Sequence, residues 1–149
     1  MKKMLVAAAM SILCCAAFAG DGLDDFLRNT NVQARADMAG FSVSLSSQFG
    51  VNDVQVRAVL GSVGQPADAF MIFQLGAMTH QPVERVLQVY RSGHGKGWGA
   101  IAKDLGIKPG SPEFHALKRG DFRLASAGGE ASPADHGKGH GHGRGKNNH

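Results

Sequence analysis

The chain has 149 residues, of which 43% are hydrophobic, 19% charged and 7% aromatic, and its formal net charge is +4. This composition fits one domain of ordinary size and excludes a coiled coil, a collagen and a membrane protein with several spans. The charge excess is smaller than a dedicated nucleic-acid-binding protein usually carries. It is also uneven, because residues 20–78 hold 3 basic and 6 acidic side chains whereas residues 79–125 hold 8 and 4.

The first 19 residues have the pattern of a secretory signal peptide. Lys2 and Lys3 precede an apolar run that is too short to serve as a membrane anchor, and small residues flank Phe18 at a peptidase site. We predict cleavage after Ala19 and a periplasmic or secreted protein, with an uncleaved signal anchor as the alternative. Both cysteines lie in this segment, so we expect no disulfide and no cysteine-based metal site in the mature chain.

The region 23–49 is predicted to be helical. Its apolar residues recur every three or four positions, at Met38, Phe41, Leu45 and Phe49. Serines between positions 42 and 47 are poor helix formers, and apolar residues also alternate between positions 41 and 45. A strand is therefore the alternative for this part of the chain.

Clear start and stop signals follow. Asn52 is a good N-cap for a helix that Gly64 would end, and Pro66 opens an apolar segment that we expect to be the central core helix. Pro82 opens a further amphipathic helix, which Gly93 closes.

The glycine-rich run 93–97 predicts a loop between two amphipathic helices. A helix over 98–105 should end at Gly106, and Ser111 followed by Pro112 is a strong start signal for a last helix that Gly120 ends. The sequence therefore predicts an all-α fold, a small bundle of short helices over residues 20–125. Residues 126–149 lack apolar periodicity and are predicted to be a disordered tail rich in Gly, His and Lys.

The segment 95–118, Gly-Lys-Gly-Trp-Gly-Ala-Ile-Ala followed by Lys-Asp-Leu-Gly-Ile-Lys-Pro-Gly-Ser-Pro-Glu-Phe-His-Ala-Leu-Lys, resembles that of small exported bacterial proteins, and so does the segment 80–87. Those proteins are similar in having a signal peptide, a short helical region and a tail rich in Gly, Lys and His. The resemblance covers about a third of the chain and implies bacterial export. It implies no activity.

The tail offers a possible metal site. Imidazole is a good ligand for Zn, Cu and Ni, and glycine spacers would let several rings reach one ion. The candidate ligands are His136, His140, His142 and His149. The alternative is a solvated basic tail whose histidines follow composition, so we expect no required cofactor.

The basic half suggests two kinds of contact. The helix over 98–105, its glycine-containing turn and the helix over 112–118 are similar to a DNA-binding helix-turn-helix, in which the second helix would expose Glu113, His115, Lys118 and Arg119. An ordinary helical hairpin uses the same turn, and export would separate the protein from the chromosome, so we do not expect chromosomal DNA as a partner. The same region could instead contact an anionic envelope polymer or another protein. The candidate binding residues are His94, Lys96, Lys103, Lys108, Lys118 and Arg119.

Catalysis has no motif to support it. Residues able to serve as acids, bases or nucleophiles are scattered: His80, Glu84, Ser92, His94, Asp104, Ser111, Glu113 and His115. Trp98 could stack on a sugar ring or a nucleobase, but its spacing with Ile101 and Leu105 predicts a core position. We therefore predict a non-catalytic exported binding module, with periplasmic metal binding by the tail and nucleic-acid binding as alternatives.

Overall fold

A computed structural model describes residues 22–93 and 95–125. These residues form seven helices and no strand, which confirms the all-α prediction. The helices are α1 (Gly22–Ala36), α2 (Met38–Phe49), α3 (Asp53–Leu60), α4 (Pro66–Thr79), α5 (Val83–Ser92), α6 (Trp98–Asp104) and α7 (Pro112–Arg119). The predicted signal peptide, His94 and the predicted tail lie outside the described residues.

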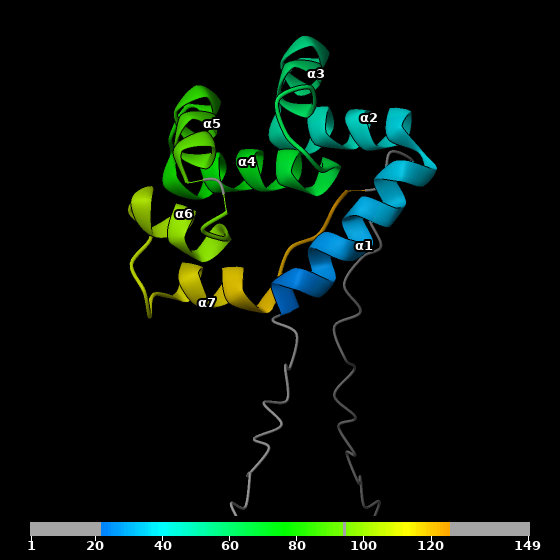
Figure 1. The fold of residues 1–149 in the computed structure, drawn as a ribbon. Coiled ribbons are helices and arrows are strands. Elements are labelled where there is room, and N and C mark those ends of the chain that lie inside the picture. Colours follow the sequence, from blue (N-terminus) through cyan, green and yellow to red (C-terminus); the bar gives the residue numbers. More distant parts are fainter. Residues whose placement is uncertain (1–21, 94, 126–149) are drawn as a thin grey trace, which may run out of the picture.

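Helix α4 is the centre of the molecule. It contacts α1, α2, α3 and α5, and nearly all of its residues from Ala67 to Gly76 are buried (Figure 1). Consecutive helices contact each other around it, and α7 returns to contact α1. The predicted central core helix is therefore confirmed, and its nearly uniform apolar sequence follows from being covered on several sides.

The predicted helical region 23–49 is two helices rather than one. Asp37 has non-helical backbone angles, and its carboxylate accepts a hydrogen bond from the backbone N–H of Gly40 at 2.8 Å. The carboxylate therefore caps the start of α2, and the helix is interrupted at Asp37. The strand alternative is not formed, because the hydroxyls of Ser42 and Ser44 donate to the carbonyls four residues before them and are accommodated in α2.

Most of the predicted caps are formed. Asn52 accepts from the backbone N–H of Gln55 at 2.8 Å, and Ser111 accepts from that of Phe114 at 3.1 Å. Gly120 ends α7 in the left-handed conformation. Helix α3 differs from the prediction, because it ends at Leu60 with Gly61 as its cap, and the residues up to Gly64 form a loop.

The two ends of the described chain meet. Gly22, which begins α1, lies so close to the end of α7 that a Cβ atom on it would overlap the carbonyl of Arg119 and stand 2.8 Å from the carbonyl carbon. The segment after α7 then runs along the core, where Phe122 contacts the rings of Phe26 and Phe70. The Gln48 side chain holds its end, donating to the carbonyl of Arg123 at 2.9 Å and accepting from the N–H of Ala125 at 2.8 Å.

Candidate functional site

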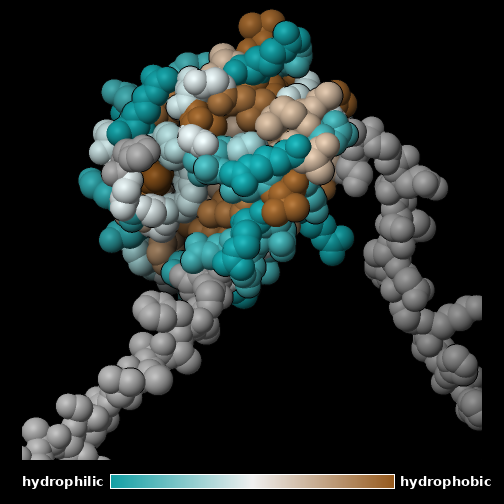
Figure 2. Space-filling model, turned by 45° about the vertical axis from the view of Figure 1, so that its right-hand side comes forward, coloured by the Kyte–Doolittle hydropathy of each residue, from teal (hydrophilic) through white to brown (hydrophobic). Residues whose placement is uncertain are grey.

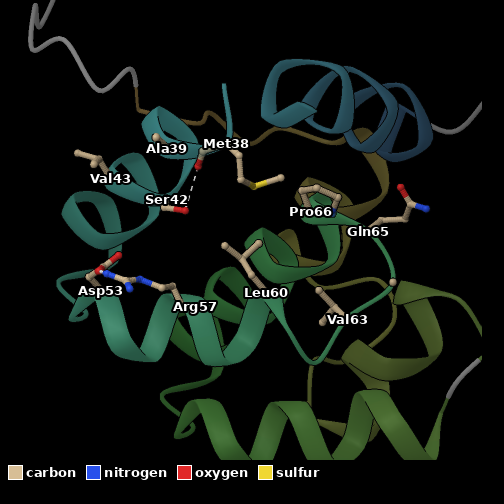
Figure 3. A pocket seen from close by; sticks show the side chains of 11 residues that line it. Met38, Ala39, Ser42, Val43, Asp53, Arg57, Leu60, Val63, Gln65 and Pro66 are labelled. Atoms are coloured by element: carbon tan, nitrogen blue, oxygen red, sulfur yellow. Dashed lines mark hydrogen bonds and ion pairs between the residues drawn. The ribbon is translucent and has the colours of Figure 1, made fainter. Parts of the chain in front are cut away.

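A groove of about 640 Å³ lies between α2, α3 and the loop that leads into α4 (Figure 3). Its floor and walls are mainly apolar. They are formed by Met38, Ala39, Val43, Leu60, Val63 and Pro66. In Figure 3 the Met38 side chain extends across the groove toward Pro66, above Leu60. We refer to this feature below as the α2–α3 groove.

Large apolar side chains are exposed around the α2–α3 groove. Met38 is 43% exposed and Val43 is 55% exposed, and both line it. Val54, in the first turn of the adjacent α3, is 76% exposed. Apolar surface also interrupts the polar surface at the top of Figure 2, where Figure 1 places α3. Isolated exposed apolar residues are ordinary, but Met38 and Val43 line the same concave site and Val54 lies on a helix that borders it.

Polar groups stand at the rim of the groove. On one side Arg57 forms an ion pair with Asp53, and both side chains are more than half exposed. On the other side Arg35 donates a hydrogen bond to the Gln65 side chain, which lies away from Arg57 in Figure 3. Arg57 therefore lines the groove itself, whereas Arg35 is connected to it through the side chain of the lining residue Gln65.

The chemistry of this groove suits binding. A volume of about 640 Å³ lies within the range of about 300–1,000 Å³ that is typical of ligand sites. Its lining contains neither His nor Cys, and its one carboxylate, that of Asp53, is engaged by Arg57. The groove can therefore remove apolar side chains from water, whereas it presents no nucleophile with an adjacent base.

The predicted basic binding residues lie in the carboxyl-terminal part of the described chain, and they belong to separate elements. Lys96 is in the loop before α6, Lys103 is in α6 and Lys108 is in the loop before α7. Lys118 and Arg119 are in the last turn of α7. All five are exposed, and Arg119 is held by Asp121, with 2.6 Å between Nε and the carboxylate.

One of these residues lines a cavity. Lys108 borders a space of about 320 Å³ beside the start of α7, together with Ser111 and Glu113. Hydrogen bonds from its own backbone N–H and from Ser111 lower the pKa of Glu113. Ser111 and Glu113 thus act at the start of α7 as a cap and its acidic partner, as the sequence predicts.

No metal site is found within the described part of the chain. Residues 22–93 and 95–125 contain no group of three His, Cys, Asp or Glu side chains able to hold an ion. The four candidate ligands His136, His140, His142 and His149 and the loop residue His94 lie outside the described residues, so the metal prediction stays a prediction.

Sequence reasoning missed the α2–α3 groove. It assigned Met38 to the same apolar face as Phe41 and Leu45, which are buried, whereas Met38 turns into the groove and is partly exposed. A signal was present at Val43, because a large apolar residue two positions from a buried one stands off the core face of a helix. Residues distant in the sequence form the opposite wall, and no local pattern connects them to α2.

Comparisons of the chain with protein-family models, with curated proteins and with solved structures find no match. Across the residues that the structure describes, none of the helices has both the length and the hydropathy that crossing a bilayer requires.

Proposed function

We propose that this protein is an exported, non-catalytic interaction module whose α2–α3 groove binds the apolar face of an amphipathic helix of a partner protein. The observation that carries the proposal is the convergence of Met38, Val43 and Leu60 on a groove of about 640 Å³. Export rests on the signal-peptide pattern of residues 1–19.

A helix suits this groove because α2 and α3 already contact each other and leave an apolar surface facing outward. A third helix placed there would add its side chains at positions i, i+3, i+4 and i+7, as in other helix-in-groove complexes. The chain's own carboxyl-terminal residues do not supply such a face, because residues 126–149 contain no Leu, Ile, Val, Met or aromatic residue. Residues 1–19 do contain large apolar side chains, but the proposed export removes them, so the occupant that we propose is a separate molecule.

The polar residues at the rim of the groove predict the charge of the partner. Arg57 already has Asp53 as a partner, but Arg35 donates to the neutral side chain of Gln65. A carboxylate on the bound helix would offer Arg35 a stronger, charge-assisted hydrogen bond. We therefore expect the bound helix to carry Asp or Glu beside its apolar residues.

A matched pair of substitutions tests the groove. The purified protein is used to select binders from a library of helical peptides, and binding is then measured for Val43→Glu and Val32→Glu. Val32 is 62% exposed on α1 and does not line the groove, so it controls for an added carboxylate. We expect selected peptides to share apolar residues at helical spacing with acidic residues beside them, and Val43→Glu alone to weaken binding by about tenfold or more.

Equal effects of the two substitutions would contradict the assignment of the groove. So would a concentration-dependent dimer, measured by sedimentation, that Val43→Glu abolishes, because the occupant would then be a second copy of the chain. Among the described residues, the large exposed apolar side chains other than Val32 lie at or beside the groove, so a second copy would have to bind through this same face.

A second candidate is electrostatic binding of an anionic envelope polymer. The observation in its favour is that Lys96, Lys103 and Lys108 are exposed and form no ion pair with another residue of the described ranges. Such cations are available to a polyanion at little desolvation cost. The salt dependence expected for this binding is given in the Discussion.

A further inference from the structure

A second concave site lies where α5 and α6 meet, beside the first turn of α4. It has a volume of about 320 Å³ and is lined by Asp68, Tyr90, Gly95, Gly97, Trp98 and Ile101. None of these residues takes part in the α2–α3 groove. We refer to it as the Trp98 cleft.

The cleft joins an aromatic surface to a carboxylate. The rings of Trp98 and Tyr90 are stacked, with centroids 5.3 Å apart and an angle of 22° between their planes. The Tyr90 hydroxyl donates to Asp68 Oδ2 at 2.9 Å, and the same oxygen accepts the backbone N–H of Gln65 at 3.2 Å. Tyr90 is buried whereas Trp98 is half-buried, so Trp98 presents the accessible part of the aromatic pair.

Asp68 retains capacity for a ligand. Both hydrogen bonds found for its side chain within the described residues end on Oδ2, and neither uses Oδ1. Side-chain oxygens that are fully buried without a partner are not found in this part of the chain, so Oδ1 is accessible to solvent. A ligand hydroxyl entering the cleft could therefore donate to a carboxylate that Tyr90 and the α4 N-terminus already hold in position.

The remaining wall is made of backbone. Gly95 and Gly97 have φ values of +87° and +80°, and a Cβ atom added to either would meet open space. These glycines let the loop adopt its conformation and leave room beside Trp98. Lys96, between them, is exposed and does not itself line the cleft, so its positive charge lies near the site rather than in it.

The geometry points to a binding site for a pyranose sugar in the Trp98 cleft, with the ring's C–H face against Trp98 and a hydroxyl donating to Asp68. Amphipathic aromatic side chains suit such ligands because a sugar has one apolar face and a polar edge. A quaternary ammonium ligand also uses aromatic rings and would be attracted by Asp68, so it is the competing occupant that the titration below tests. The proposal is independent of the groove and of its partner.

The sequence provides a specific probe for this site. Trp98 is the only tryptophan and Tyr90 the only tyrosine of the chain, so intrinsic fluorescence reports on the cleft alone. The purified protein is titrated with glucose, N-acetylglucosamine and galacturonate, with choline as the cationic probe and glycerol as a polyol without a ring. We expect a saturable change in Trp98 emission with at least one of the three sugars and none with choline or glycerol.

Two substitutions test the assigned roles. Asp68→Asn should weaken binding of the responding sugar by about tenfold, because a charge-assisted hydrogen bond becomes a neutral one. Lys96→Glu changes an exposed residue and leaves the fold intact, and it should weaken galacturonate more than a neutral sugar. Far-UV circular dichroism confirms the fold of each variant.

The outcomes separate cleanly. Saturable binding by choline alone would make this an ammonium site, and a response shared with glycerol would be a solvent effect on the indole; either result overturns the proposal. A flat titration with all three sugars also overturns it. If Asp68→Asn unfolds, the Lys96→Glu comparison and the titration of the unsubstituted protein still decide the matter.

Discussion

Replacing either of two glycines, each in the first turn of its helix, by alanine should change the free energy of unfolding in opposite directions. Gly22 begins α1 against the end of α7, and a Cβ atom there would overlap the Arg119 carbonyl. Gly99 lies in α6, where the nearest atom to an added Cβ is the Phe114 ring edge at 3.8 Å, an ordinary contact. The substitution is the same in both cases, but the surroundings differ.

The magnitudes follow from these distances. Alanine is favoured over glycine within a helix by about 0.5–1 kcal/mol, and Gly99→Ala should gain much of this free energy because nothing obstructs it. Forcing extra atoms into packed structure costs about 1–3 kcal/mol. At Gly22 the obstacle is backbone, which cannot move aside as a flexible side chain can, so Gly22→Ala should lower the free energy of unfolding by about 1–2 kcal/mol.

Thermal unfolding followed by far-UV circular dichroism measures both effects. About 1 kcal/mol corresponds to about 4–8 °C in Tm for a domain of this size. We expect Gly99→Ala to raise Tm by a few degrees and Gly22→Ala to lower it by about 5–10 °C. A Tm for Gly22→Ala at or above that of the unsubstituted protein would refute the close approach of α1 and α7.

Three further expectations concern titration, charge and metal. Burial, and then the hydrogen bond to Asp68, raise the pKa of Tyr90; the stability that depends on its neutral form is therefore present below the ordinary tyrosine pKa of about 10 and is lost as pH rises through the folded value. Ultraviolet titration of this single tyrosine should show ionisation at a higher pH in the folded protein than in a denatured control. Ionisation at the same pH in both would contradict this expectation. Binding to a polyanion such as heparin should weaken steeply with salt, and deleting residues 126–149, which carry three basic side chains beyond residue 135, should reduce that dependence without abolishing it. No binding at low ionic strength would remove the electrostatic candidate. Equilibrium dialysis against Zn, Cu and Ni should show metal binding that weakens below pH ~6.5. Replacing His140 and His142 together should weaken this binding and leave thermal stability unchanged. Unchanged affinity in that variant would exclude these two histidines as ligands.

The fold could be predicted from the sequence wherever local chemistry decides the outcome. Asn52, Ser111 and Gly120 act through backbone groups within a few residues, so their roles as caps could be read directly. The interruption at Asp37 could not, because an Asp within an apolar pattern is also common on the solvent face of a continuous helix. Only the backbone angles at Asp37 and its bond to Gly40 distinguish the two cases.

The candidate sites likewise divide into features that residue type alone predicts and features that need residues distant in the sequence. Lys96, Lys103 and Lys108 are exposed, as charged residues usually are, so their accessibility could be anticipated from their type. The α2–α3 groove combines residues of α2 with Leu60, Val63 and Pro66, which approach Met38 only after α4 has placed the preceding loop. The Trp98 cleft likewise needs Asp68 of α4 beside Tyr90 of α5, a pairing 22 residues apart that no spacing rule contains.

The way Gln48 holds the carboxyl-terminal segment constrains the order in which this chain can fold. Its side-chain amide bonds backbone groups 75 and 77 residues later, and α7 packs against α1. Contacts between distant parts of a chain close slowly, and here they cannot form until residue 125 has left the ribosome or a translocation channel. Phe26 therefore lacks its Phe122 partner throughout synthesis. A chain built this way delays its final packing until nearly all of it has emerged, and during that interval α1 offers uncovered apolar surface to chaperones.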